Sequence, residues 1–154
     1  MNPPGNDLLV LMPTLSAQQF PDGSIGLTTK FVDGVKEYLK YWNGHVRVLM
    51  EPSEIRSAHL DNARFRPESL PFEIHIVDYT SPDLGRHLED AAMVHCAASH
   101  RQNHIADLCL SLRLLCVYGT EISLRTRMQI IDSETSSRIL RIRRYVCTSL
   151  GKYC

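Results

Sequence analysis

The chain has 154 residues, the length of one ordinary domain, and this length argues against a second compact domain. Its 17 Lys and Arg balance its 17 Asp and Glu, and the resulting net charge of zero argues against a general nucleic-acid-binding surface. The composition, 44% hydrophobic and 22% charged, is typical of a soluble globular protein. No apolar run reaches the roughly 18 residues that a membrane span needs, and residues 1–10 lack the basic start of a secretory signal.

The charge is unevenly distributed along the chain. Residues 1–120 carry 10 Lys or Arg against 14 Asp or Glu, whereas residues 121–154 carry 7 against 3. A basic helical segment of this kind is usually a solvated helix face. The alternatives are that this basic segment binds a partner subunit, a phosphate group or an anionic surface. If the surface is that of a membrane, the contact would be peripheral.

The cysteines are odd in number and include no C-x-x-C pair. Three of them lie within apolar runs, which is typical of free, buried thiols in a reducing compartment rather than of a disulfide framework. The cysteine usage therefore predicts a cytoplasmic protein. The five positions are Cys96, Cys109, Cys116, Cys147 and Cys154.

The first part of the chain alternates between strand-like and helix-like patterns. Residues 8–12 form a continuous apolar run, which predicts a strand buried on both faces. A loop rich in Gly, Pro and Asp follows over residues 13–26, and apolar residues three or four apart predict a helix over residues 27–42. Gly44 is expected to end this helix as a left-handed cap, and residues 45–50 predict a second strand.

The middle of the chain is less regular. Residues 53–71 are polar, with one weak helical stretch over residues 55–63, and residues 72–77 predict a third strand. Ser81, as an N-cap residue before a proline, is expected to begin a short helix that ends near Asp90.

The last part repeats the alternation. Residues 92–97 predict a fourth strand, and Ser99 and Gln102 have the spacing of a capping box for the helix that follows. Residues 114–118 predict a fifth strand, and amphipathic spacing over residues 124–146 predicts a long C-terminal helix.

Strands that alternate with helices predict an α/β fold: a single Rossmann-like domain over residues 1–154, with a parallel sheet of about five strands flanked by helices. In an open parallel sheet, ligands bind beyond the carboxyl ends of the strands, where the strand order reverses. The residues that follow each strand are therefore the candidates for a site.

The long loop after the first predicted strand contains three of these candidates. Gly23, Ser24 and Gly26 lead into the predicted helix start, where free N–H groups and the helix dipole favour an anion or a sugar hydroxyl. The loop lacks the G-x-G-x-x-G spacing of a dinucleotide site and the G-x-x-x-x-G-K-[ST] of a P-loop, so both functions are disfavoured. A plain turn is the alternative interpretation.

Two further candidates follow the fourth and fifth strands. His100 and Glu121 at adjoining strand ends would suit proton transfer or recognition of a hydroxyl group, and Arg125 lies one helical turn after Glu121. The alternative is that His100 only occupies a helix start and that Glu121 interacts favourably with a helix dipole.

A group of histidines raises the question of a metal site. His100 and His104 are one helical turn apart, and His95 precedes them. Zinc requires three or four convergent ligands, however, and His95 is expected within a strand, while no H-E-x-x-H motif is present. The sequence predicts no bound metal and no cofactor.

Two stretches of the chain resemble GT-B glycosyltransferases of the group 1 kind. The glycine-containing loop, the helix and N-G-H-V-R-V-L at residues 43–49 are similar to the start of the N-terminal, acceptor-side domain in that family. The sequence T-E-I-S-L-R-T-R at residues 120–127 is similar to the T-E-Y-S-L-R-T-R helix start that follows the fifth strand in a subset of these enzymes. The likeness covers about residues 8–144.

The resemblance implies transfer of a sugar from a nucleotide-sugar donor to a sugar or glycan acceptor, without a bound metal ion. In that family a C-terminal domain holds most of the donor. The N-terminal domain supplies the acceptor surface, a glycine loop under the diphosphate, and often a histidine after the fourth strand. The residues that correspond here are Gly23 and Gly26 for the loop, His100 for the histidine, and Glu121 and Arg125 for the rim of the cleft.

The chain departs from the family pattern in two places. Many members have an H-x-H motif at the end of the fourth strand, whereas here Ala97 stands two residues after His95. The sequence also ends at Cys154 without a donor-binding domain, so we expect a truncated chain or one half of a split enzyme. Such a chain would be inactive alone and would act with a donor-domain partner chain or as a homo-oligomer. The alternative is a non-catalytic flavodoxin-like or receiver-like binding module. A receiver would have an acidic pair after the first strand, where Pro13 and Thr14 stand.

Overall fold

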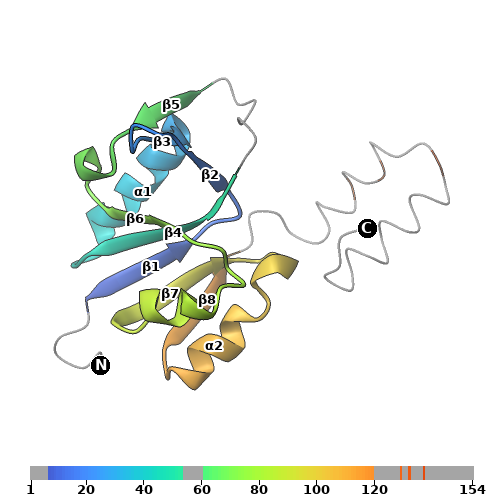
Figure 1. Ribbon diagram of the computed structural model, residues 1–154. Coiled ribbons are helices and arrows are strands. Elements are labelled where there is room, and N and C mark those ends of the chain that lie inside the picture. Colours follow the sequence, from blue (N-terminus) through green and yellow to red (C-terminus); the bar gives the residue numbers. More distant parts are fainter. Residues whose placement is uncertain (1–6, 54–60, 120–128, 130–131, 133–136, 138–154) are drawn as a thin grey trace.

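The computed structural model describes residues 7–53 and 61–119, together with residues 129, 132 and 137. The described part is built on a mixed sheet of eight strands with helices packed on it (Figure 1), which confirms the α/β class. The strands are β1 (Leu8–Met12), β2 (Ser16–Gln19), β3 (Ile25–Thr28), β4 (Val46–Pro52), β5 (Asn62–Phe65), β6 (Glu73–Ile76), β7 (Ala91–Ala97) and β8 (Leu115–Gly119). The helices are α1 (Thr29–Tyr41), α2 (Ile105–Ser111) and the short 3-10 helices η1 (Pro67–Ser69), η2 (Pro82–His87) and η3 (His100–Gln102).

The five strands that the sequence predicts pair with one another in parallel, in the order β6–β4–β1–β7–β8. Val48 of β4 is paired with both Leu11 of β1 and Ile74 of β6, so β1 and β6 lie along opposite edges of β4. Every residue of β1 is buried, as its continuous apolar run predicts for a strand in the middle of a covered sheet.

The expected loop over residues 13–26 is instead an extension of the sheet. After β1 the chain pairs with the end of β4 as β2, turns, and returns as β3, which is antiparallel to both β2 and β5. Gly23 takes a φ of +80° in the turn, a conformation that glycine adopts without strain. The sheet is therefore mixed and has eight strands rather than about five parallel ones.

Helix α1 begins two residues later than expected, because Leu27 belongs to β3. The Thr28 hydroxyl caps the helix by accepting a hydrogen bond from the Phe31 N–H at 3.1 Å. At the other end, Gly44 is not a left-handed cap. A Cβ on Gly44 would overlap the backbone of Asp7, so the glycine allows the chain leading into β1 to pass close by.

The two faces of the sheet carry separate apolar clusters. Alternate residues of β1 point to opposite faces, so Leu9 lies in the same cluster as Val35 of α1, while Val10 lies in the same cluster as Ile105 of α2. Helix η2 covers the same face as α2, and the Ser81 hydroxyl caps it by accepting a hydrogen bond from the Asp83 N–H at 3.2 Å. The predicted helix start at Ser81 is thus confirmed, as a 3-10 helix.

Two expected helices are not found as predicted. The weak helical stretch over residues 55–63 overlaps β5 at Asn62 and Ala63, and its residues 55–60 lie outside the described residues. The long C-terminal helix expected over residues 124–146 falls almost wholly on positions that are not described, so it stays a prediction.

Candidate functional site

The order of the parallel strands reverses at β1. From β1 the chain passes to β4 and β6 on one side of the sheet, and then to β7 and β8 on the other side. In open parallel sheets the crevice beyond the carboxyl ends of the two strands at such a reversal is the usual place for a ligand. Here these strands are β1 and β7, which end at Met12 and Ala97.

A cleft of about 640 Å³ lies at this reversal, between α1 and the ends of β1, β7 and β8. We call it the α1 cleft. Its volume falls within the range of roughly 300–1,000 Å³ that is typical of small-molecule sites. Leu15, Phe31 and Val35 contribute apolar wall. The polar and charged residues that line it are Thr14, Thr28, Lys30, Tyr38, Asp61 and His95.

Tyr38 and His95 meet at the wall of the α1 cleft. Tyr38 Oη and His95 Nδ1 are 3.1 Å apart and share a hydrogen bond that links α1 to β7. The other ring nitrogen, Nε2, lies against Gly119 at the end of β8, where a Cβ would come within 2.6 Å of it. Gly119 thus leaves room for the imidazole, and the Tyr38 hydroxyl orients it. An imidazole held in this way is suited to exchange a proton with a bound hydroxyl group.

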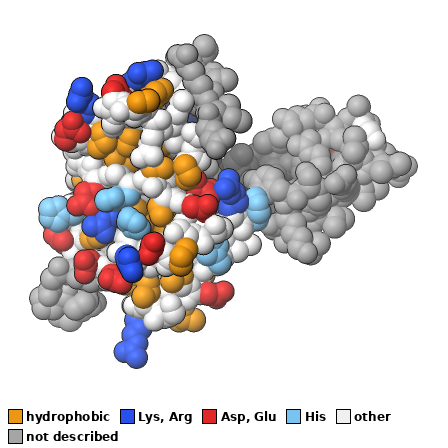
Figure 2. Space-filling view, in the orientation of Figure 1, with side chains coloured by type: hydrophobic (Ala, Val, Ile, Leu, Met, Phe, Trp, Pro, Cys, Tyr) orange, Lys and Arg blue, Asp and Glu red, His pale blue; other side chains and the backbone are white. Residues whose placement is uncertain are grey.

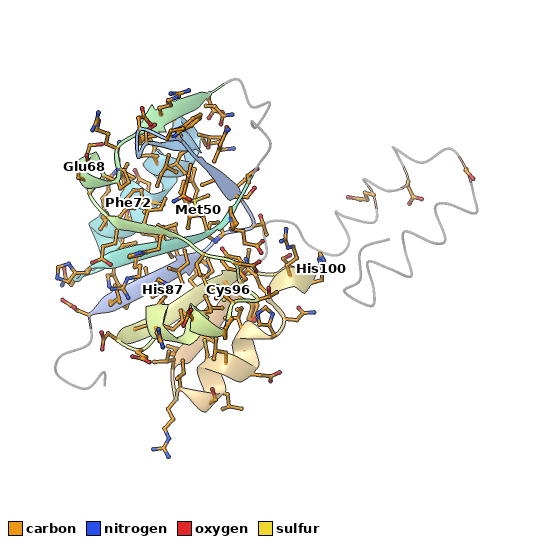
Figure 3. The ribbon with its side chains drawn as sticks, in the orientation of Figure 1. Met50, Glu68, Phe72, His87, Cys96 and His100 are labelled. Atoms are coloured by element: carbon orange, nitrogen blue, oxygen red, sulfur yellow. The ribbon has the colours of Figure 1, made fainter. Side chains whose placement is uncertain are left out.

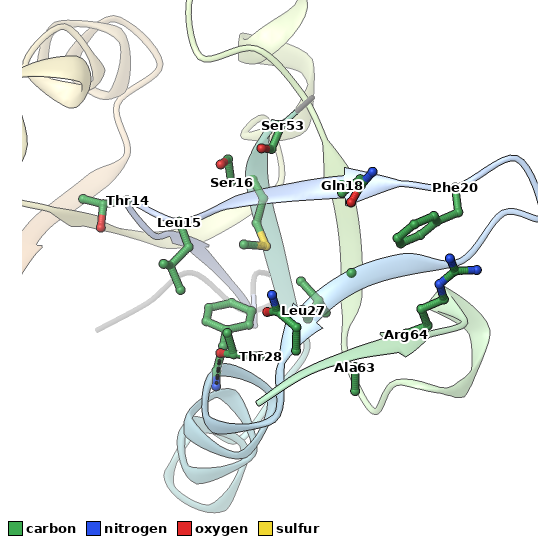
Figure 4. Close-up of a pocket in the computed structure, with 14 residues that line it drawn as sticks. Thr14, Leu15, Ser16, Gln18, Phe20, Leu27, Thr28, Ser53, Ala63 and Arg64 are labelled. Carbon is green, nitrogen blue, oxygen red and sulfur yellow. Dashed lines mark hydrogen bonds between the residues drawn. The ribbon is translucent and has the colours of Figure 1, made fainter. Parts of the chain in front are cut away.

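A smaller pocket of about 360 Å³ lies beside the α1 cleft, among β2, β3 and β5 (Figure 4). The Arg64 guanidinium lies over the Phe20 ring in this hairpin pocket, 3.8 Å from the ring centroid, a cation–π contact. Gly26 lines the pocket, and a Cβ there would lie 3.3 Å from Phe20 Cε2. The residues shared by the hairpin pocket and the α1 cleft are Thr14, Leu15, Thr28 and Phe31.

The N-terminus of α1 is occupied by Asp61, from the chain just before β5. Lys30 N–H donates to Asp61 Oδ2 at 3.3 Å, and the Thr29 N–H and hydroxyl both donate to the Asp61 carbonyl, at 3.1 and 2.9 Å. The helix dipole stabilises a carboxylate in this position. The chain therefore supplies its own anion where the sequence suggested the anion of a ligand.

Gln102 ties together the ends of the central strands. Its side chain is buried; Oε1 accepts a hydrogen bond from the Ala97 N–H at 2.9 Å, and Nε2 donates to the Pro13 carbonyl at 3.0 Å. The buried Tyr79 hydroxyl lies 3.0 Å from the same Pro13 carbonyl and 2.7 Å from the Leu49 carbonyl. These contacts join β1, β4 and β7 at the edge where the α1 cleft opens.

The predicted capping box is only half formed. The Ser99 hydroxyl accepts a hydrogen bond from the Arg101 N–H at 3.4 Å, but the Gln102 side chain bonds to Ala97 rather than back to Ser99. The turn that follows Ser99 is η3, and α2 begins separately at Ile105. A side chain expected to stabilise a helix start instead supports the carboxyl edge of the sheet.

The carboxyl edge also carries an ionised carboxylate after β6. Asp78 accepts hydrogen bonds from the Thr80 N–H at 2.8 Å and from the Thr80 hydroxyl at 2.7 Å. These bonds, and to a smaller extent the positive charge of Arg101, lower the pKa of Asp78.

The structure separates the residues that the sequence singled out. Gly23 and Ser24 lie in the turn between β2 and β3, where the Ser24 N–H and hydroxyl donate to Asp22 Oδ1 at 3.0 and 2.6 Å, while Gly26 lines the hairpin pocket. His100 begins η3, is exposed, and does not line the α1 cleft; Figure 3 shows it beyond the strand ends. Glu121 and Arg125 lie outside the described residues. Their roles stay predictions.

The sequence did not indicate that Tyr38 and His95 meet in the α1 cleft. The predicted strand position of His95 is confirmed, and that position argued against a role for it as a metal ligand. The alternation of side chains along a strand could have predicted the direction of His95. Val94 and Cys96 are buried on the α2 face, and His95, which lies between them, points to the α1 face. Tyr38 lies on the helix face that the spacing of Phe31 and Val35 defines.

Among the described residues, no three His, Cys, Asp or Glu side chains are grouped so that they could hold a metal ion. His104 precedes α2, and its Nε2 lies 2.8 Å from the Tyr79 carbonyl. No helix in the described part of the chain has both the length and the apolar character needed to cross a membrane.

These features define an α/β protein with a ligand-sized cleft at the reversal of its strand order. Comparison of the chain with models of protein families, with curated proteins and with solved structures finds no match. The inference of function therefore depends on the cleft and on the resemblance seen in the sequence.

Proposed function

We propose that this chain is the acceptor-side domain of a glycosyltransferase and that the α1 cleft receives the acceptor sugar. The single observation that carries the proposal is the position of the α1 cleft at the strand reversal. The order β6–β4–β1–β7–β8 supports a Rossmann-like core. If these five strands alone are numbered along the chain, their order in the sheet is 3-2-1-4-5. The resemblance of residues 43–49 and 120–127 to group 1 GT-B enzymes supports the class of reaction.

The lining of the α1 cleft is suited to a sugar. A pyranose ring has apolar C–H faces and a rim of hydroxyl groups, and Phe31 and Tyr38 offer aromatic surface beside the polar groups of Thr14, Lys30 and His95. Tyr38 orients His95, so we assign the role of cleft histidine to His95 in place of His100.

In the proposed reaction, an acceptor hydroxyl attacks the anomeric carbon of the nucleotide sugar. The bond from that carbon to the diphosphate breaks, and the nucleoside diphosphate leaves. His95 takes the proton of the hydroxyl at Nε2, while Nδ1 keeps its hydrogen bond with Tyr38. Bringing the two substrates together in the right geometry makes a large contribution to the rate of such a reaction. A donor-domain partner chain would hold the nucleotide sugar, and Glu121 and Arg125 remain the candidates for the rim of the cleft.

The proposal is tested by titrating the full chain separately with methyl glycosides and with nucleotide sugars, followed by NMR. We expect glycosides to shift the signals of Tyr38 and His95, and nucleotide sugars to bind far more weakly. His95→Gln should weaken glycoside binding, whereas His45→Gln, at the amino end of β4, should leave it unchanged. Strong binding of nucleotide sugars without glycoside binding would contradict the proposal. Phosphorylation by acetyl phosphate would instead indicate a receiver-like module.

A further inference from the structure

Gly34 lies in the interior of α1 and lines the α1 cleft. Glycine is among the least favourable residues in a helix, because it loses the most conformational freedom on folding. Among the described residues, a Cβ added to Gly34 would meet no atom within 4 Å. Close neighbours explain why positions 44 and 119 are glycine, because an added Cβ would collide with Asp7 at Gly44 and with His95 at Gly119. No such neighbour among the described residues explains the glycine at position 34.

Side chains on both sides of Gly34 along α1 leave a gap above its backbone. We call this gap, which lies between Lys30 and Phe31 on one side and Tyr38 on the other, the slot. Lys30 lies four residues before it and Tyr38 four residues after it, and residues at this spacing lie on one face of a helix. Phe31, three residues before Gly34, lines the α1 cleft as well. The backbone of Gly34 is therefore open to a ligand between Phe31 and Lys30 on one side and Tyr38 on the other.

We propose that a pyranoside ring with equatorial hydroxyl groups lies flat on α1 over Gly34. This rests on the proposed function and deepens it, since it names the acceptor ring and how that ring sits. A ring with equatorial substituents presents a flat C–H face, which fits a helix surface without a side chain. An axial hydroxyl on that face would hold the ring away from the helix. The ring edge then reaches the Lys30 ammonium and the paired Tyr38 and His95 side chains.

Three variants of the full chain test the slot. Gly34→Leu fills it, Gly34→Ala fills it in part, and Lys36→Leu adds the same side chain to the opposite side of α1. Binding of methyl β-D-glucopyranoside and methyl α-D-mannopyranoside is measured by NMR titration, and folding by the melting temperature. Leucine and alanine are better helix formers than glycine, so neither change at Gly34 should lower the melting temperature.

We expect the glucoside to bind more tightly than the mannoside. Gly34→Leu should weaken glucoside binding at least tenfold, Gly34→Ala less, and Lys36→Leu not at all. Equal glucoside binding by wild type and Gly34→Leu overturns the slot but leaves the proposed function, because the sugar then binds elsewhere in the cleft. Equal or tighter binding of the mannoside also overturns the slot. If neither glycoside binds the wild type, both the slot and the proposed function are wrong.

Discussion

The Arg101 guanidinium lies 2.8 Å from the Glu51 carboxylate and joins the residues after β7 to the end of β4. The Glu51 side chain is only 9% exposed, whereas that of Arg101 is 60% exposed. A carboxylate at this depth has lost most of its hydration, and the guanidinium replaces part of it. The pair thus helps to hold together the edge of the sheet at which the candidate site lies.

Arg101→Ala should lower the free energy of unfolding by about 1–3 kcal/mol, because it removes the donor of a buried acceptor. Urea denaturation measures the change. The matched control is Arg86→Ala: Arg86 pairs with Asp83 at 3.2 Å, but both side chains are well exposed, so the loss should stay below about 1 kcal/mol. Equal losses for the two variants would show that the burial of Glu51 does not strengthen its ion pair.

Gly119→Ala should displace the His95 ring, because the added Cβ would lie 2.6 Å from Nε2. We expect loss of the bond between Tyr38 and His95, a change in the His95 imidazole signals in NMR, and a destabilisation of about 1–3 kcal/mol from overpacking. In Gly85→Ala the nearest atom to the new Cβ is Leu108 Cδ1 at 3.9 Å, so this control should leave His95 unchanged. Unaltered His95 signals in Gly119→Ala would contradict the assigned packing.

The stability of the protein should fall between pH 7.5 and 5.5 because of His87. Burial, and then the nearby His75 and Arg47, lower the pKa of His87 below its usual value of 6.5, while Asp83 raises it slightly. The His75 and His87 ring centroids are 5.2 Å apart, and Figure 2 shows imidazoles beside charged side chains on this face. The unfolded chain therefore binds a proton at His87 more readily than the folded protein does. The contribution of neutral His87 to the free energy of unfolding is fully present above pH 6.5 and is lost as the pH falls through the His87 pKa of the folded protein.

Urea denaturation at the two pH values measures this dependence, and His87→Gln should reduce it. Glu73 does not contribute to the change between pH 7.5 and 5.5. The hydrogen bond from Arg47 lowers the pKa of Glu73 below the usual 4.5, so the contribution of the Glu73 carboxylate to the free energy of unfolding is lost only at a lower pH. If wild type and His87→Gln lose the same stability between pH 7.5 and 5.5, His87 is not the titrating group.

The thiols of Cys96 and Cys109 should react slowly in the folded protein. They are free, and burial raises the pKa of Cys96 strongly and that of Cys109 to about 12. Since the thiolate is the nucleophile, few molecules are reactive at neutral pH. In a background in which Cys116, Cys147 and Cys154 are replaced by serine, an aromatic disulfide reagent should label both thiols at least 100-fold more slowly in buffer than in denaturant. Fast labelling in buffer would contradict the described core.

Local signals were sufficient for the five parallel strands and for most of α1. A continuous apolar run as short as residues 8–12, stopped by Pro13, is typical of a strand covered on both faces, and every residue of β1 is buried. The strand β2 has no such signal: Ser16–Gln19 is polar, and only Ala17 is buried. It exists because β4 and β3 supply pairing partners, so residues 13–26 look like a loop until those partners are placed.

The amino-acid sequence by itself determined the α/β class and the location of the parallel strands, because these follow from the period of its apolar residues. Only the tertiary structure decided which polar groups meet. His95 lies 57 positions from Tyr38, and Gln102 bonds to Pro13 across 89 positions. Such pairs depend on strand order and register, which bring distant segments together, and no spacing within one segment records them.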